Sequence, residues 1–140
     1  MQIIQRAIVR SSFADMAPKA SDLAHAFYEE LFALDPGVKP LFNSDPHQQG
    51  EKLLQMIGAA IDLLEQPERL NLLLQQLGRR HVGYGVRRGH YRLVGLALAR
   101  SLERVLGERC TAEVRQAWMR FCRLITQQMI AGAAELQAAA

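Results

Sequence analysis

The sequence has no long apolar run and no secretory leader pattern. None of its apolar stretches reaches the roughly 20 residues that a membrane-spanning helix needs. The opening MQIIQRAIVRSS carries charge early and is not followed by a small-residue cleavage pattern. Cysteine is scarce, and Cys110 and Cys122 form neither a CxxC pair nor a metal-ligand cluster. We therefore expect no membrane partner, and two lone thiols favour the cytoplasm.

A large excess of one charge is also missing. The chain has 17 basic and 14 acidic residues, which gives a net charge of +3. The basic residues form no long block, and only 6% of the chain is aromatic. A nucleic-acid surface needs more charge on one face with aromatic residues between the cations. We therefore expect no nucleic-acid partner. The densest basic cluster surrounds His81 and consists of Arg79, Arg80, Arg87 and Arg88.

No segment alternates apolar and polar residues as a strand would. Helical periodicity runs through nearly all 140 residues, and leucine, alanine, glutamine and arginine favour helices. We expect one all-α domain over residues 1–140, with six or seven helices separated by proline and glycine. The helices expected from breakers alone are Ile3–Ala17, a short turn through Pro40–Phe42, Pro46–Leu64, Arg69–Arg80 and His90–Leu106. Two more have a predicted cap: Ser21 or Asp22 begins a helix that ends at Leu34, and Thr111 begins a last helix that runs to the C-terminus.

The leucine-rich helix carries a histidine on its apolar face. Its stripe at helical spacing is Leu70, Leu73, Leu74 and Leu77, and His81 follows one turn later. His81 is therefore predicted to point into the core. One interpretation is a histidine at the end of the helix that hydrogen-bonds the terminal carbonyls. The alternative is an imidazole that offers one nitrogen to iron while the other donates to a backbone carbonyl.

Three further residues have two interpretations each. Gln49 lies on the apolar stripe of its helix, so it either reaches solvent or stands at the mouth of a pocket. Tyr28 shares a face with apolar residues, and its hydroxyl needs a partner in the core or in a site. Phe42, in DPGVKPLF, is either plain core or a flat wall for a planar ligand. The inner stripes of the last two helices are ordinary core patterns, and Cys122 is interpreted as a small buried apolar residue.

Four stretches together carry a resemblance: FYEELFALDPGVKPLF, QGEKLLQMIG, LGRRHVGYGV and GHYRLVG. In this order and at these separations they resemble the globin family, specifically the single-domain bacterial globins and the haem domain of flavohaemoglobins. The resemblance covers essentially the whole chain. It implies a globin fold whose helices sandwich haem b, iron protoporphyrin IX.

The resemblance also assigns roles to residues of this chain. His81 is similar to the proximal iron ligand, Phe42 to the phenylalanine on the porphyrin face, and Tyr28 and Gln49 to the distal pair that hydrogen-bonds a diatomic gas. Leu53 is similar to the apolar residue beside that gas. Leu77, Val86 and Val94 would line the proximal side, and Tyr91 is similar to the proximal tyrosine of the flavohaemoglobin lineage. His25, His47 and His90 are not expected to be ligands, although His47 lies close enough to Gln49 for a loop movement to bring it to the iron.

The implied function is reversible binding of dioxygen, with carbon monoxide and nitric oxide as further ligands. The alternative is a nitric oxide dioxygenase that a separate reductase restores. The flavohaemoglobin glutamate falls at Ala133, and Glu135, two residues on, should face away. That departure, and the end of the chain at residue 140 before any reductase domain, favour oxygen binding. A haem-free helical regulator is the third hypothesis. The arginines around His81 are interpreted as a face in contact with solvent. They could instead pair with the haem propionates or with an acidic protein. No oligomeric state is predicted.

Overall fold

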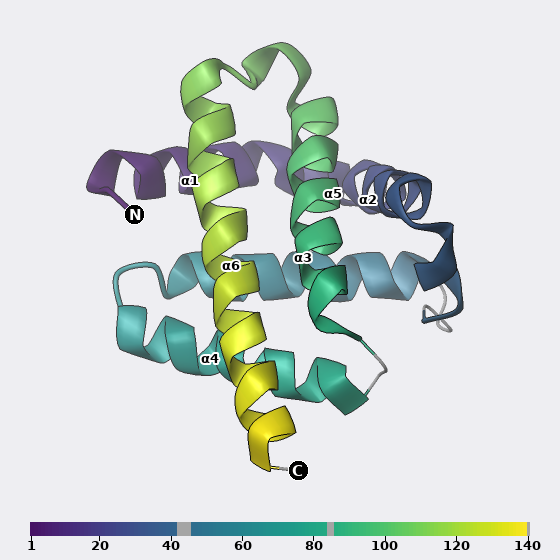
Figure 1. Cartoon of the computed structure of the whole chain (residues 1–140). Coiled ribbons are helices and arrows are strands. Elements are labelled where there is room, and N and C mark those ends of the chain that lie inside the picture. The colour runs from purple at the N-terminus through teal and green to yellow at the C-terminus, as the bar shows by residue number, and fades with distance from the viewer. Residues whose placement is uncertain (42–45, 84–85, 140) are drawn as a thin grey trace.

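The computed structural model describes residues 1–41, 46–83 and 86–139, without the side chains of residues 46, 47, 49 and 136–139. Within these ranges the chain forms α-helices and short 3-10 helices and no strand, which confirms the all-α prediction (Figure 1). The elements are α1 (Ile3–Met16), η1 (Ala17–Lys19), α2 (Ala20–Leu34), η2 (Pro36–Leu41), α3 (Pro46–Asp62), α4 (Pro67–Gly83), α5 (Arg88–Leu106), η3 (Gly107–Arg109) and α6 (Ala112–Ala139). None of the helices in these ranges is long and apolar enough to cross a bilayer.

Side chains at the helix starts decide where the elements begin. The backbone N–H of Val114 donates to Thr111 Oγ1 at 3.3 Å, so Thr111 caps α6 as predicted. The predicted start of α5 at His90 is wrong by two residues. The backbone N–H of Arg87 donates to His90 Nδ1 at 2.9 Å, and this bond allows the helix to begin at Arg88. The predicted caps of α2 also fail, because Ser21 lies inside a helix that already begins at Ala20.

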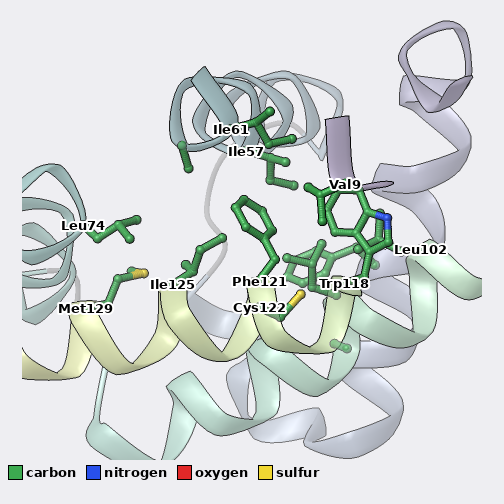
Figure 2. Close-up of a cluster of buried hydrophobic side chains, with 14 of the residues drawn as sticks. Val9, Ile57, Ile61, Leu74, Leu102, Trp118, Phe121, Cys122, Ile125 and Met129 are labelled. Carbon is green, nitrogen blue, oxygen red and sulfur yellow. The ribbon is translucent and has the colours of Figure 1, made fainter. Parts of the chain in front are cut away.

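Helices α5 and α6 run side by side in opposite directions, and α1, α3 and α4 cross behind them (Figure 1). The core lies where α6 faces these crossing helices. Phe121 points from α6 toward Ile57 and Ile61 of α3, and all three are buried (Figure 2). Trp118 Nε1 donates to Ser12 Oγ at 2.7 Å, which ties α6 to α1. Truncation of a core aromatic such as Phe121 costs about 3–5 kcal/mol, so α6 contributes much of the stability.

The packing of α4 against α6 depends on two glycines. A Cβ at Gly78 would lie 2.0 Å from the carbonyl oxygen of Met129, and a Cβ at Gly132 would lie 2.0 Å from that of Gln75. Each helix therefore presents a glycine to a backbone carbonyl of the other. No larger residue fits at this crossing without moving one helix, and α4 is the helix that carries His81.

Candidate functional site

His81 lies in the last turn of α4 with one ring nitrogen committed to the backbone. Its Nδ1 lies 2.8 Å from the carbonyl oxygen of Leu77. A carbonyl only accepts, so the ring donates from Nδ1, and the neutral imidazole then carries its lone pair on Nε2. This is the arrangement in which a histidine presents Nε2 to a metal while the backbone fixes its tautomer.

Two other histidines have surface roles. His25 Nε2 lies 3.3 Å from Glu29 Oε2, and the His25 side chain is 79% exposed. His90 accepts the Arg87 N–H at the start of α5. The side chain of His47 lies outside the described residues. Of the histidine side chains that the structure describes, His81 is the one whose Nδ1 lies against a backbone carbonyl, whereas His90 accepts from a backbone N–H and His25 pairs with a carboxylate.

The burial of α4 agrees with the prediction that His81 continues its apolar face. The buried stripe of α4 passes through Leu70, Leu74 and Gly78, because Gly78 brings α6 close to this face. His81 follows Leu74 by two turns, so it lies on this same face in the last turn of the helix, where it is half-buried. The ring therefore stands at the edge of the core, where a bound group can reach it.

Tyr91 of α5 lies beside this histidine and is 2% exposed. The ring centroids of His81 and Tyr91 are 6.4 Å apart. The Tyr91 hydroxyl donates to the carbonyl oxygen of Gly78 at 3.2 Å, and burial raises the pKa of Tyr91. The single O–H of this tyrosine is therefore already bonded to a backbone carbonyl.

A carboxylate does not join Tyr91 on this side of the site. Ala133 of α6 is 5% exposed, so the position at which the resemblance expects a glutamate is a buried methyl group. Glu135 is exposed and its Oε2 lies 3.1 Å from Arg79 Nη2. This confirms the prediction that Glu135 faces away. Among the described residues, His81 and Tyr91 contact the carbonyls of Leu77 and Gly78, which carry no charge.

Tyr28 of α2 is half-buried in an aromatic setting. Its ring centroid lies 5.3 Å from that of Phe27 in an edge arrangement and 5.8 Å from that of Phe32 in a stacked one. Desolvation by burial raises the pKa of Tyr28 to about 12. The phenol therefore stays protonated at neutral pH and remains a hydrogen-bond donor.

The crossing of α2 and α3 brings the two predicted distal positions into one region. A Cβ at Gly50 would lie 2.4 Å from the Cβ of Ala24, so this glycine permits a close approach of the two helices. Ala24 is one turn before Tyr28 on α2, and Gly50 follows Gln49 on α3. The side chain of Gln49 and the whole of Phe42 lie outside the described residues, and their roles stay predictions.

The predicted apolar lining is half-buried rather than buried. Leu53 of α3, Leu77 of α4, Val86 just before α5 and Val94 of α5 are all intermediate in exposure and pack against the core. Helices α3 and α4 follow one another but make few contacts with each other. Half-buried apolar side chains beside an imidazole are what a flat apolar metal complex would cover. On this chemistry, the described residues fit a haem with His81 as its iron ligand.

Sequence reasoning missed the residues that position this site. Gly78 and Gly132 set the approach of α6, and Gly50 sets that of α3. A glycine inside a helical pattern was the available signal. Such a glycine lowers helix stability, and it often occurs where another helix packs closely. Phe32, which stacks on Tyr28, has no predicted role in the site.

A separate apolar groove lies between α1 and the start of α6. Its lining includes Ile3, Ile4, Ala7, Ile8 and Val114, with Asp15 and Arg109 as its ionisable residues. These two are 3.7 Å apart and form an ion pair. The groove has no histidine in its lining and is made by helices other than α4, so it is not the candidate site.

Comparisons with known proteins agree with this geometry. The sequence pattern of the Globin family matches residues 25–129. The flavohemoprotein of Bordetella pertussis is 32% identical over 117 residues, which are 81% of this chain and 29% of that protein. The chain therefore spans under a third of that relative's length. The structure is also similar to that of a bacterial globin from Campylobacter jejuni, with a TM-score of 0.85 at 24% identity. The match covers 98% of this chain and 99% of that globin. A hexacoordinated heme protein from an anhydrobiotic tardigrade has a TM-score of 0.86 at 14% identity, with 96% of each chain covered.

Proposed function

Because this chain belongs to the globin family, whose members are haem proteins, we propose that it binds dioxygen reversibly at the iron of a haem b that His81 holds. The observation that carries the proposal is the hydrogen bond from His81 Nδ1 to the Leu77 carbonyl at 2.8 Å. This bond selects the tautomer with a basic Nε2 and fixes the plane of the ring before any iron binds. When bound, the haem would supply an iron that takes a diatomic gas.

On the distal side, Tyr28 would donate a hydrogen bond to the bound gas. A dioxygen ligand gains partial negative charge, whereas carbon monoxide gains much less, so a phenol donor favours dioxygen. Burial keeps Tyr28 protonated, and its two ring neighbours restrict where the hydroxyl lies. We assign Gln49 as a second donor, with Leu53 and Phe42 as apolar contacts of the gas and the porphyrin.

On the proximal side, Tyr91, Leu77, Val86 and Val94 would contact the porphyrin or shield the histidine from water. The backbone carbonyl that accepts from His81 carries no charge. A carboxylate partner would give the ring more anionic character and push electron density toward the iron. Its replacement by buried Ala133 favours reversible binding over oxygen activation.

Nitric oxide dioxygenation is the second candidate function. Similarity to a flavohemoprotein supports it, since a flavin-linked electron supply would return the iron to the ferrous state. The same Tyr28 would then hold dioxygen for reaction with nitric oxide. Nitrate formation in the presence of a reductase distinguishes this function from reversible binding.

The experiment is a comparison of visible spectra for wild type, His81→Ala and His25→Ala. We expect the wild type and His25→Ala to take up haem and to show a Soret band that shifts under carbon monoxide. His81→Ala should lose the haem or show an altered ferrous spectrum. His25 is the matched control because it is an exposed histidine paired with Glu29. Identical spectra for His81→Ala and wild type would refute the assignment of the ligand.

A further inference from the structure

The charge of this chain is unevenly distributed. No aspartate or glutamate occurs between residues 69 and 102, and every cation in that stretch is an arginine. The stretch covers nearly all of α4 and most of α5, the two helices that carry His81 and Tyr91. A small net charge of +3 therefore conceals a basic proximal half.

Four exposed arginines gather where α4 meets α5. The backbone N–H of Val86 donates to the carbonyl oxygen of His81 at 3.2 Å, which closes the corner between the two helices. The arginine corner, as we call it, consists of Arg80 in the last turn of α4, Arg87 and Arg88 at the start of α5, and Arg92 one turn later.

These arginines are not used in the packing of the fold. Arg79 is paired with Glu135 at 3.1 Å, and Arg100 lies 4.0 Å from Glu30. Across the described ranges, no carboxylate forms an ion pair with a member of the arginine corner. The N-terminus of α5, at Arg88, adds the positive end of a helix dipole to the same place. The corner therefore presents uncompensated positive charge next to the histidine.

The composition of the corner suits a protein partner. Arginine is enriched in protein interfaces and lysine is depleted, and the stretch from 69 to 102 contains no lysine. Leu96 follows Arg92 by one turn on α5 and is 42% exposed, so an apolar contact lies beside the charges. A nucleic-acid surface would instead combine cations with exposed aromatic rings, and the described residues of the corner include no exposed aromatic ring.

We propose that the arginine corner docks an acidic protein that donates electrons to the haem iron. The inference rests on the proposed function, because it needs the haem at His81. In the step, the donor loses one electron and ferric iron gains it to become ferrous; no covalent bond forms or breaks. Oppositely charged surfaces raise the rate of such encounters by about 10- to 1,000-fold, and added salt reduces that gain.

The test uses the haem-loaded protein and the reduced form of a bacterial flavodoxin as an acidic donor. The variant is Arg87→Glu/Arg88→Glu. Its matched control is Arg120→Glu/Arg123→Glu, which makes the same charge change at two exposed positions of α6. Stopped-flow absorbance measures reduction of ferric protein at low and high salt. Dithionite, a small reductant, reports whether the haem itself has changed.

We expect the corner variant to be reduced by flavodoxin at least about tenfold more slowly than wild type at low salt. The difference should shrink at high salt, and the α6 control should stay much closer to wild type. Dithionite reduction, haem retention and the carbon monoxide spectrum should be unchanged in all three proteins.

Three results would overturn the proposal. Equal slowing in both double variants would mean that net charge alone matters. Faster haem loss from the corner variant would mean that these arginines hold the haem. Binding of a short DNA duplex that the corner variant loses, with its flavodoxin rate unchanged, would make the partner a nucleic acid. A wild type without a haem spectrum refutes the proposed function instead, and the spectra show this before any kinetics.

Discussion

Replacement of Tyr28 by phenylalanine removes one of the two proposed distal donors while leaving the ring in place. The ring is held by an edge contact with Phe27 and stacking on Phe32, at centroid distances of 5.3 Å and 5.8 Å. Tyr28→Phe preserves both contacts and deletes only the hydroxyl. A hydrogen bond to a charged partner contributes about 1.5–3 kcal/mol. At about 1.4 kcal/mol per factor of ten, dioxygen should dissociate about 10- to 150-fold faster.

The assay is stopped-flow replacement of dioxygen by excess carbon monoxide, with flash photolysis for the rebinding rates. Carbon monoxide dissociation supplies the internal control, because that ligand carries little charge and gains little from the phenol. The carbon monoxide rate should change far less than the dioxygen rate. Equal acceleration for both gases would mean that the mutation opened the pocket, and an unchanged dioxygen rate would mean that Tyr28 is not the donor.

Three further predictions follow from the geometry. Gly132→Ala should lower the free energy of unfolding, measured by urea titration, by about 1–3 kcal/mol, because its methyl group meets a backbone carbonyl of α4 at 2.0 Å. The control is Gly89→Ala, whose Cβ meets nothing within 4 Å; it should be neutral or stabilising by up to about 1 kcal/mol. Ala133→Glu should lower the ferric/ferrous midpoint potential in spectroelectrochemistry and raise nitrate formation from nitric oxide. The control is Ala133→Gln, which has nearly the same shape without the charge and should change neither quantity. Equal potentials for the two variants would refute the electronic argument. The raised pKa of Tyr28, about 12 against an ordinary 10.0, means that its contribution to stability is fully present below pH 10 and is lost as the pH rises toward 12. Dioxygen dissociation should accordingly stay constant up to about pH 10, and acceleration well below that pH would contradict the assigned pKa.

The helices could be predicted because periodicity and breakers act locally. Pro36 begins η2, and Pro67 begins α4 two residues before the predicted Arg69. Gly107 follows the end of α5 and takes a φ of +56°. The boundary error at α5 arose from a side chain, since the bond from Arg87 to His90 depends on a rotamer that no propensity records.

The site could be predicted less completely. Helical spacing identified His81, and the resemblance assigned it a role, because both depend on one-dimensional order. Which residues of α4 are fully buried could not be predicted, since the approach of α6 at Gly78 decides this. That approach is a tertiary contact between residues far apart in the sequence. The donation from Tyr91 to the Gly78 carbonyl is likewise a tertiary contact, between α5 and α4.

The central claim is that His81 Nε2 binds the haem iron. Its most direct test is the iron–histidine stretching band in the resonance Raman spectrum of the ferrous protein without gas. We predict one band that shifts when histidine is labelled with nitrogen-15, disappears in His81→Gly and returns when imidazole is added to that variant. A histidine-sensitive band that persists in His81→Gly without imidazole would contradict the account, because another histidine would then hold the iron.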